Sequence, residues 1–237
     1  MSLAPEGRPF IGAGLALAVL FLLLGLVLGG TGDGSNASFG SALFWSRASL
    51  WAAGVLGVLT AFVVFFFRSP HRTPPKDPRA VVAPGDGLVV QIADIGHVDF
   101  LDGPAVRISI FLSLFDVHVQ RSPLAGTIRH RSYRKGGFAA AWNARASEEN
   151  EQATLGIASE PHRVLVRQIA GLVARRVVTD PEEGDRVGRG DRIGLIRFGS
   201  RVDLFVPSHW EVTCARGDRA RGGESVMALV PPAGEGA

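Results

Sequence analysis

The chain has 237 residues, 46% of them hydrophobic, and its 25 lysines and arginines against 22 aspartates and glutamates give a formal net charge of +3. This length suits one compact domain of ordinary size together with a membrane anchor. The single cysteine, Cys214, excludes an internal disulfide and a cysteine-based metal site, and we expect it to be a small buried hydrophobic residue. The basic residues lack the aromatic-interleaved pattern of RNA-binding motifs, so we expect no nucleic-acid partner.

Two apolar segments near the N-terminus are each long enough to cross a membrane, which takes about 20 residues. Residues 10–30 and 48–67 contain no charged side chain, and the polar, Gly/Ser-rich stretch 31–47 joins them. A signal peptide is the alternative for the first segment. However, its apolar core is longer than that of a signal peptide, and no convincing small-residue cleavage site follows it. We therefore predict a two-helix transmembrane hairpin that makes residues 1–67 a membrane anchor.

The distribution of basic residues predicts the orientation of this hairpin. Arg8 precedes the first segment, the connecting stretch carries only Arg47 against Asp33, and four basic residues follow the second segment: Arg68, Arg72, Lys76 and Arg79. The positive-inside rule then places both chain ends, and the domain that follows, on the cytoplasmic side of the inner membrane. The prolines of residues 68–79 predict a stiff, non-helical linker.

From residue 80 onward, short β-type segments alternate with turn signals. Apolar and polar residues alternate most clearly in RVDLFVP (201–207), and tight turns are expected at Pro84–Gly87 and Gly188–Asp191. Residues 136–152 are rich in Ala and Glu and predict a loop with a short helix. The hairpin-rich stretch EEGDRVGRGDRIGLI resembles the halves of barrel-sandwich domains of the biotinyl and lipoyl type. We therefore predict a mainly β, barrel-sandwich-like soluble domain over residues 80–237.

Three short segments carry residues that could perform chemistry. In Arg-Phe-Gly-Ser (197–200), Gly199 tolerates a strained backbone, and the Ser200 hydroxyl could add to the Gly199 carbonyl and convert the amide into an ester. Elimination and hydrolysis would then leave a pyruvoyl group at residue 200, with fragments 1–199 and 200–237. A serine needs a base, for which His118 is the natural candidate, and Asp86 could orient its imidazole.

Each of these residues also has a purely structural alternative. Gly-Ser pairs occur by chance throughout proteins, and His118 could be an ordinary hydrogen-bonded histidine of a strand. Asp86 lies in a Pro-Gly-Asp-Gly turn, where most aspartates simply cap the turn through their own side chain. The residues alone leave these alternatives open.

The order of the motifs resembles a known family. The chain reads PGDG, FDVHVQRSP followed by LAG, EENEQATLG, RVLVRQIAG and RFGSRVDLFVP, which is similar to the phosphatidylserine decarboxylases over about residues 67–230. It resembles most the short form, in which Gly-Ser replaces a longer Leu-Gly-Ser-Thr signature. The resemblance implies a self-processing triad of Asp86, His118 and Ser200, with Gly199 as the cleavage glycine.

Two positions depart from the longer members of that family. Phe115 stands where those members have a second histidine, so His118 would serve both self-processing and turnover. Arg201 stands where the longer form has threonine, which agrees with the short form.

The resemblance further implies an enzyme that converts phosphatidylserine in the membrane to phosphatidylethanolamine. A pyruvoyl group derived from Ser200 would act as the electron sink, and the two fragments of the chain would stay associated. His118 is the first candidate for returning a proton to the α carbon. Arg134 and Lys135 could meet the substrate phosphodiester, with solvated loop cations as the alternative. The spacing of the Asp and His residues suggests no metal site, and a homo-oligomer stays open.

Three other functions are alternatives to a phosphatidylserine decarboxylase. A non-enzymatic barrel-sandwich carrier or membrane adaptor shares the fold, but carriers present a lysine at a hairpin tip, whereas the turns here hold Asp86 and Arg189-Gly190-Asp191. The same chemistry on another serine phospholipid is a second alternative, because no feature of the sequence indicates which acyl chains the protein recognises. A Ser/His/Asp hydrolase is disfavoured by the lack of a G-x-S-x-G elbow and of α/β alternation.

Overall fold

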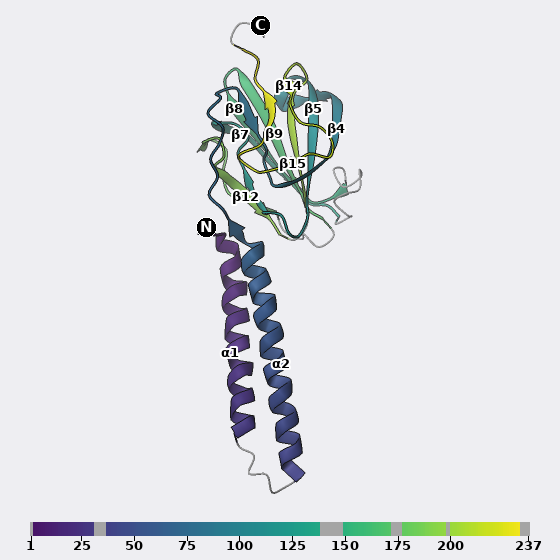
Figure 1. Ribbon diagram of the computed structural model, residues 1–237. Helices are drawn as coiled ribbons and strands as arrows, with labels where there is room; N and C mark the ends of the chain where they lie inside the picture. The colour runs from purple at the N-terminus through teal and green to yellow at the C-terminus, as the bar shows by residue number, and fades with distance from the viewer. Residues whose placement is uncertain (1, 31–36, 138–148, 172–176, 198–199, 233–237) are drawn as a thin grey trace. The chain divides into compact units, whose positions relative to one another are not determined.

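The computed structural model describes residues 2–30, 37–137, 149–171, 177–197 and 200–232 (Figure 1). The chain divides into two compact units, Met1–Pro70 and His71–Ala237. The first unit is helical and the second is built of strands, so the predicted mainly β class of the soluble domain is confirmed.

The first unit is a hairpin of two long helices. In chain order it contains β1 (Ser2–Leu3), the 3-10 helix η1 (Pro5–Gly7), α1 (Arg8–Gly30), α2 (Ala37–Phe66) and β2 (Arg68–Ser69), with β1 paired to β2. The helices pack closely at glycines. A Cβ atom at Gly25 would lie 2.9 Å from Leu50, and one at Gly14 would collide with Thr60. The Ser46 hydroxyl donates a hydrogen bond to the carbonyl of Gly25 at 2.7 Å, which fixes the register of the two helices.

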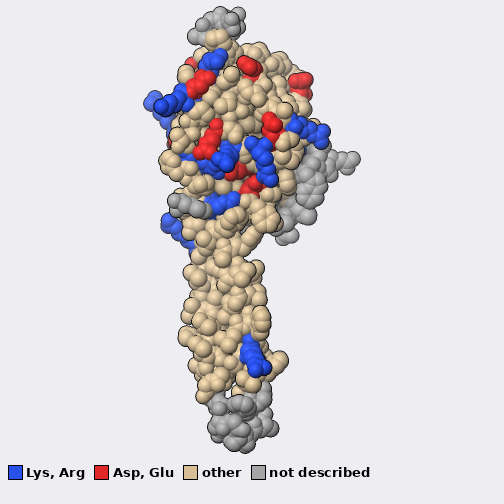
Figure 2. All heavy atoms as spheres, viewed as in Figure 1, with Lys and Arg blue, Asp and Glu red and all other residues tan. Residues whose placement is uncertain are grey.

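The second helix begins at Ala37 rather than at the predicted Ala48, so part of the predicted connecting loop is helical. The serines and Arg47 lower the hydropathy of this stretch, but helix formation depends on backbone hydrogen bonds and not on apolarity. By length and composition, both helices could cross a membrane. Figure 2 shows the charged side chains gathered over the β domain, whereas the helices carry almost none.

The second unit contains three antiparallel sheets. The largest has eight strands in the order β11-β7-β8-β9-β13-β5-β4-β15, and the two small sheets are β10-β12-β6 and β14-β16-β3. The strands are β3 (Ala80–Val82), β4 (Gly87–Val98), β5 (Gly103–Leu112), β6 (Val119–Arg121), β7 (Gly126–Arg134), β8 (Gln152–Ser159), β9 (His162–Ile169), β10 (Val177–Thr179), β11 (Arg186–Val187), β12 (Arg192–Ile196), β13 (Ser200–Pro207), β14 (Glu211–Val212), β15 (Arg219–Ala220) and β16 (Val226–Leu229), with a 3-10 helix η2 (Asp99–Leu101) between β4 and β5. Most of the predicted loop 136–152 lies outside the described residues.

One face of the large sheet forms the hydrophobic core together with residues of the small sheets. Because side chains alternate along a strand, β13 turns Val202, Leu204 and Val206 into this core. Val81 of β3 and Met227 of β16 pack into the same cluster. This arrangement of sheets around a single core agrees with the predicted sandwich (Figure 1). The free thiol of Cys214 is half-buried against the cluster, so it is less buried than expected.

The proline-rich segment that follows β2 lies against the β domain from residue 71 onward. The guanidinium of Arg189, in the predicted Gly188–Asp191 turn, donates to the backbone carbonyls of Pro75, Asp77 and Ala80 at 2.6–2.7 Å. Three charge-assisted hydrogen bonds from one side chain fix this segment in place.

Candidate active site

Ser200 is the first residue of β13 and pairs in register with Leu112, the last residue of β5. Its side chain is fully buried, and its Oγ has no hydrogen-bond partner among the described residues. Leaving a buried hydroxyl without a partner costs about 1–3 kcal/mol, and such an exception in a native fold often marks a reactive group. Ser200 shares the core-facing side of the strand with Val202. The predicted cleavage glycine, Gly199, lies outside the described residues.

His118 lies beside the segment that leads to Ser200. Its backbone carbonyl accepts a hydrogen bond from the amide of Ile196 at 3.3 Å, continuing the pairing of β12 with β6. On the other side, Ser200 pairs with Leu112. The loop 113–117 connects Leu112 to His118. Ser200 is therefore bonded at the beginning of this loop, and Ile196 at its end. The fold therefore brings the predicted base and the predicted nucleophile into one neighbourhood.

The imidazole of His118 is fully buried and has a defined orientation. Its Nδ1 lies 3.0 Å from the backbone carbonyl oxygen of Asp116. A carbonyl can only accept, so Nδ1 carries the hydrogen, and in the neutral ring Nε2 is the basic nitrogen. The Asp116 carboxylate fixes this loop in turn, because it accepts hydrogen bonds from the amide and hydroxyl of Ser113 and from Arg219. This orienting carbonyl could not be recognised in the sequence.

The turn that carries Asp86 packs next to Ser200. A Cβ atom at Gly85 would lie 3.1 Å from Val202, so the turn is in contact with the strand that Ser200 begins. Gly87 has φ of +154°, and a Cβ atom there would collide with the carbonyl of Phe111, so only glycine fits. The predicted turn therefore places Asp86 beside the paired ends of β5 and β13.

The carboxylate of Asp86 has partners other than the predicted one. Arg72 donates to its Oδ2 at 2.6 Å, and the amide of Gly222 donates to its Oδ1 at 2.8 Å. Its hydrogen bonds within the described part of the chain do not include His118. Burial raises the pKa of Asp86 above its ordinary value, while the hydrogen bond from Gly222 and the charge of Arg72 act in the opposite direction. Arg72 also binds Glu224 at 3.1 Å.

Arg201, directly after Ser200, forms a buried ion pair that was not predicted from the sequence. Its Nε donates to Asp203 Oδ1 at 2.7 Å, and its Nη2 donates to the hydroxyl of Ser109 at 2.6 Å. The side chains of Arg201 and Asp203 are 2% and 0% exposed. The available signal was the spacing, because residues two apart on a strand share one face. The pair fixes the beginning of β13 from the face opposite the core.

The two residues predicted to meet a substrate phosphate lie at the end of β7. Arg134 pairs in register with Gln152 of β8, Lys135 follows it, and both side chains are exposed. Arg134 lies two residues after Ser132 on β7, so it shares the face of the sheet that carries Ser132 and, on β13, Phe205 and Arg201.

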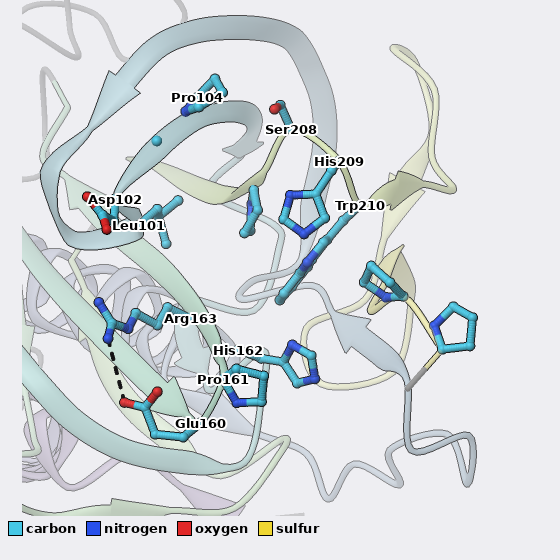
Figure 3. A pocket seen from close by; sticks show the side chains of 14 residues that line it. Leu101, Asp102, Pro104, Glu160, Pro161, His162, Arg163, Ser208, His209 and Trp210 are labelled. Atoms are coloured by element: carbon cyan, nitrogen blue, oxygen red, sulfur yellow. Dashed lines mark ion pairs between the residues drawn. The ribbon is translucent and has the colours of Figure 1, made fainter. Parts of the chain in front are cut away.

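A pocket of about 690 Å³ lies at the opposite end of β13 (Figure 3). His162, His209 and Trp210 line it, and the ring of Trp210 meets both histidines edge-on. Pro207, at the end of β13, also belongs to its lining. A strand rises about 3.3 Å per residue, so this pocket is roughly 20 Å from Ser200 and separate from the candidate site. Among the described residues, no group of three or more His, Cys, Asp or Glu side chains is placed to hold a metal ion.

Comparison with known proteins gives one consistent result. The family model of phosphatidylserine decarboxylase matches residues 59–228. Phosphatidylserine decarboxylase proenzymes of Symbiobacterium thermophilum and Geobacter metallireducens are 43% and 40% identical to the chain over 97% of its length, covering 96% and 97% of those proteins. The proenzyme of Salinibacter ruber is 46% identical over 81% of the chain and 87% of its own length. The chain therefore belongs to the phosphatidylserine decarboxylase family.

Proposed function

We propose that the chain is a proenzyme that cleaves itself between Gly199 and Ser200 and then decarboxylates phosphatidylserine to phosphatidylethanolamine. The observation that carries the self-cleavage is the buried Oγ of Ser200 at the start of β13, which has no hydrogen-bond partner in the described part of the chain and lies in the neighbourhood of His118. Membership of the family supports the decarboxylation.

Self-cleavage begins with the transfer of the Ser200 hydroxyl proton to Nε2 of His118. The Oγ atom attacks the carbonyl carbon of Gly199, the protonated His118 gives the proton to the departing nitrogen of residue 200, the peptide C–N bond breaks, and an ester replaces the amide. Loss of the α proton of residue 200 and cleavage of its Cβ–O bond then release the Gly199 carboxylate and leave dehydroalanine. Water replaces the nitrogen, which leaves as ammonia, and residue 200 becomes a pyruvoyl group.

The surroundings of residue 200 suit both stages of this chemistry. The Asp116 carbonyl keeps the hydrogen of His118 on Nδ1, so Nε2 is the nitrogen that accepts a proton. A pyruvoyl group at residue 200 supplies a carbonyl that accepts the electron pair left by departing carbon dioxide. After carbon dioxide has left, the protonated His118 returns a proton to the α carbon of the substrate.

The position of β13 supports lasting association of the two fragments. Residues 200–237 contribute β13, which pairs with β5 over eight residues and with β9 over five, both from the larger fragment. A central strand bonded on both sides cannot leave without breaking the sheet and exposing its core side chains. Cleavage therefore leaves the domain intact.

The apolar helices support a location at the membrane. In our proposal, α1 and α2 anchor the protein in the inner membrane, and the β domain acts on phosphatidylserine from the cytoplasmic side, consistent with the basic residues at both chain ends of the hairpin.

Replacing the nucleophile tests the proposal. Wild-type protein should run as two bands with the sizes of residues 1–199 and 200–237, whereas Ser200→Ala should stay full-length and release no carbon dioxide from phosphatidylserine. Ser208→Ala, an exposed serine just beyond the other end of β13, is the matched control and should be cleaved like the wild type. Cleavage of Ser200→Ala, or decarboxylation by an uncleaved chain, would contradict the proposal.

A further inference from the structure

The large sheet has a second, polar face, turned away from the core. On β13 this face carries Arg201, Asp203 and Phe205, which alternate with the core residues. A groove of about 680 Å³ opens on it and crosses several strands, and its lining includes Arg107 of β5 and Arg167 of β9. We call it the arginine groove. The pairing of β13 with its two neighbours places both arginines on this face, because Arg107 of β5 lies opposite Phe205, and Arg167 of β9 lies opposite Asp203.

The two arginines of the groove have few protein partners. Arg167 stacks on the Phe205 ring, with 5.0 Å between its guanidinium carbon and the ring centroid, and makes no hydrogen bond or ion pair with the described residues. Arg107 makes a single hydrogen bond to the described residues, from Nη2 to Oε1 of Gln91 at 3.2 Å. The Nε atoms of both arginines are buried without a partner in the described chain. Each guanidinium has five N–H donors, so most of them are available to a ligand.

The charge around these arginines is poorly compensated. Burial lowers the pKa of Arg167, and the charges of Arg134, Arg107 and Arg201 lower it further, while only Asp203 acts in the opposite direction. Asp203, however, already accepts two hydrogen bonds from Arg201. The acidic residue in the groove lining, Asp99, is fully exposed and lies 3.3 Å from His97. Holding like charges together in a partly buried place is unfavourable unless an anion occupies it.

The other walls of the groove suit an oxyanion with an organic substituent. Ser132 and Thr154, paired in register on β7 and β8, add two hydroxyl groups to the lining. The ring of Phe100 covers Gly156, where any side chain would collide with it, and forms an apolar wall. A planar guanidinium group donates two parallel hydrogen bonds to two oxygens of one phosphate, and this is the preferred way in which arginine binds phosphate.

We propose that the arginine groove is a binding site for a phosphate group, a phosphomonoester or phosphodiester, held by Arg107 and Arg167. The proposal does not depend on Ser200 or on self-cleavage, since the groove lies on the opposite face of the sheet. Free phosphate and a phospholipid headgroup share this chemistry, so both serve as probes.

Calorimetric titration of the full-length protein in non-ionic detergent tests the site. Inorganic phosphate and glycerophosphoserine are titrated in separate experiments, and binding of either one that is lost in the double variant Arg107→Gln/Arg167→Gln supports the proposal and identifies the source of the anion. The double variant Arg107→Gln/Arg167→Gln should bind at least about tenfold more weakly, because it removes the charge-assisted hydrogen bonds of both guanidinium groups to the anion. The exposed Arg216→Gln, which removes one positive charge outside the groove, should stay within about twofold of the wild type.

Thermal unfolding separates a ligand-binding role from a structural one. In the absence of anion, Arg167→Gln should leave the Tm unchanged or raise it, because the substitution removes a partly buried charge that forms no ion pair within the described part of the chain. Phosphate should raise the Tm of the wild type and leave that of the double variant unchanged, since a ligand stabilises only a protein that binds it. The proposal is overturned if the wild type binds neither probe, if the double variant binds them equally well, or if Arg167→Gln lowers the Tm while the response to phosphate persists.

Discussion

Arg72 and Asp86 form a short ion pair, with 2.6 Å between Nη2 and Oδ2. Both side chains are largely buried, at 9% and 16% exposure. The pair joins the proline-rich segment to the turn beside Ser200, and Arg72 occupies the partner position that the sequence analysis assigned to His118. Through this contact, a residue far from Ser200 in sequence lowers the pKa of Asp86.

Removing the charge of Arg72 should shift the pH dependence of self-cleavage. Burial already raises the pKa of Asp86 and Arg72 lowers it, so Arg72→Gln raises that pKa further. If ionised Asp86 supports cleavage, the acidic limb of the cleavage rate moves to higher pH, by about one unit or more for a lost arginine neighbour. Time courses of cleavage after cell-free synthesis, run across a pH series, measure the shift.

The control for Arg72 lies in the same segment. Arg79 is about half-exposed and 3.9 Å from its nearest carboxylate, so Arg79→Gln should leave the pH profile unchanged. An Arg72→Gln profile that is lower in amplitude but unshifted would show that Arg72 is purely structural.

Asp86→Asn should slow cleavage at every pH, and normal cleavage by this variant would remove Asp86 from the mechanism.

Replacing the imidazole of His118 should slow self-cleavage strongly. General-base assistance typically contributes about 10²–10⁴-fold, and His118→Ala removes the only nitrogen that we assign to this role. Quantitative gels of the uncleaved fraction over time measure the rate. The exposed His209, at the far end of β13, gives the matched variant His209→Ala, which should cleave normally. Cleavage of His118→Ala at the wild-type rate would exclude His118 as the base.

Breaking the buried Arg201–Asp203 pair should destabilise the domain. Asp203→Asn leaves the charge of Arg201 buried without its counter-ion, which typically costs about 3–5 kcal/mol. Thermal unfolding in a Ser200→Ala background, which prevents cleavage, should show a clearly lower Tm. The double variant Arg201→Met/Asp203→Leu should recover much of the loss, because it removes both charges together. A double variant no better than Asp203→Asn would contradict this explanation.

The β domain was predictable because its signals are local. Apolar alternation in RVDLFVP and the glycine turns at Gly87 and Gly190 identify strands and reversals from neighbouring residues alone. The start of α2 was placed too late because hydropathy ends at the apolar stretch, whereas the helix continues back through Arg47 to Ala37. Hydropathy reports where a helix is apolar and not where it begins.

The motifs predict Ser200, His118 and Asp86 as the candidate site, and the fold brings their segments together. The contacts that these residues make could not be predicted. The contacts of Asp86 with Arg72 and of His118 with the Asp116 carbonyl depend on how distant or backbone groups approach, which no local pattern encodes. Arg201 was expected to matter only as a departure from a signature, yet tertiary packing buries it against Asp203.

The mass of the small fragment from active wild-type protein tests the central claim most directly. The account predicts a fragment of residues 200–237 that is lighter by one ammonia than the same peptide beginning with serine, and that lacks a free amino terminus. A fragment beginning with unmodified serine, or an active chain still joined at Gly199 and Ser200, would contradict the account.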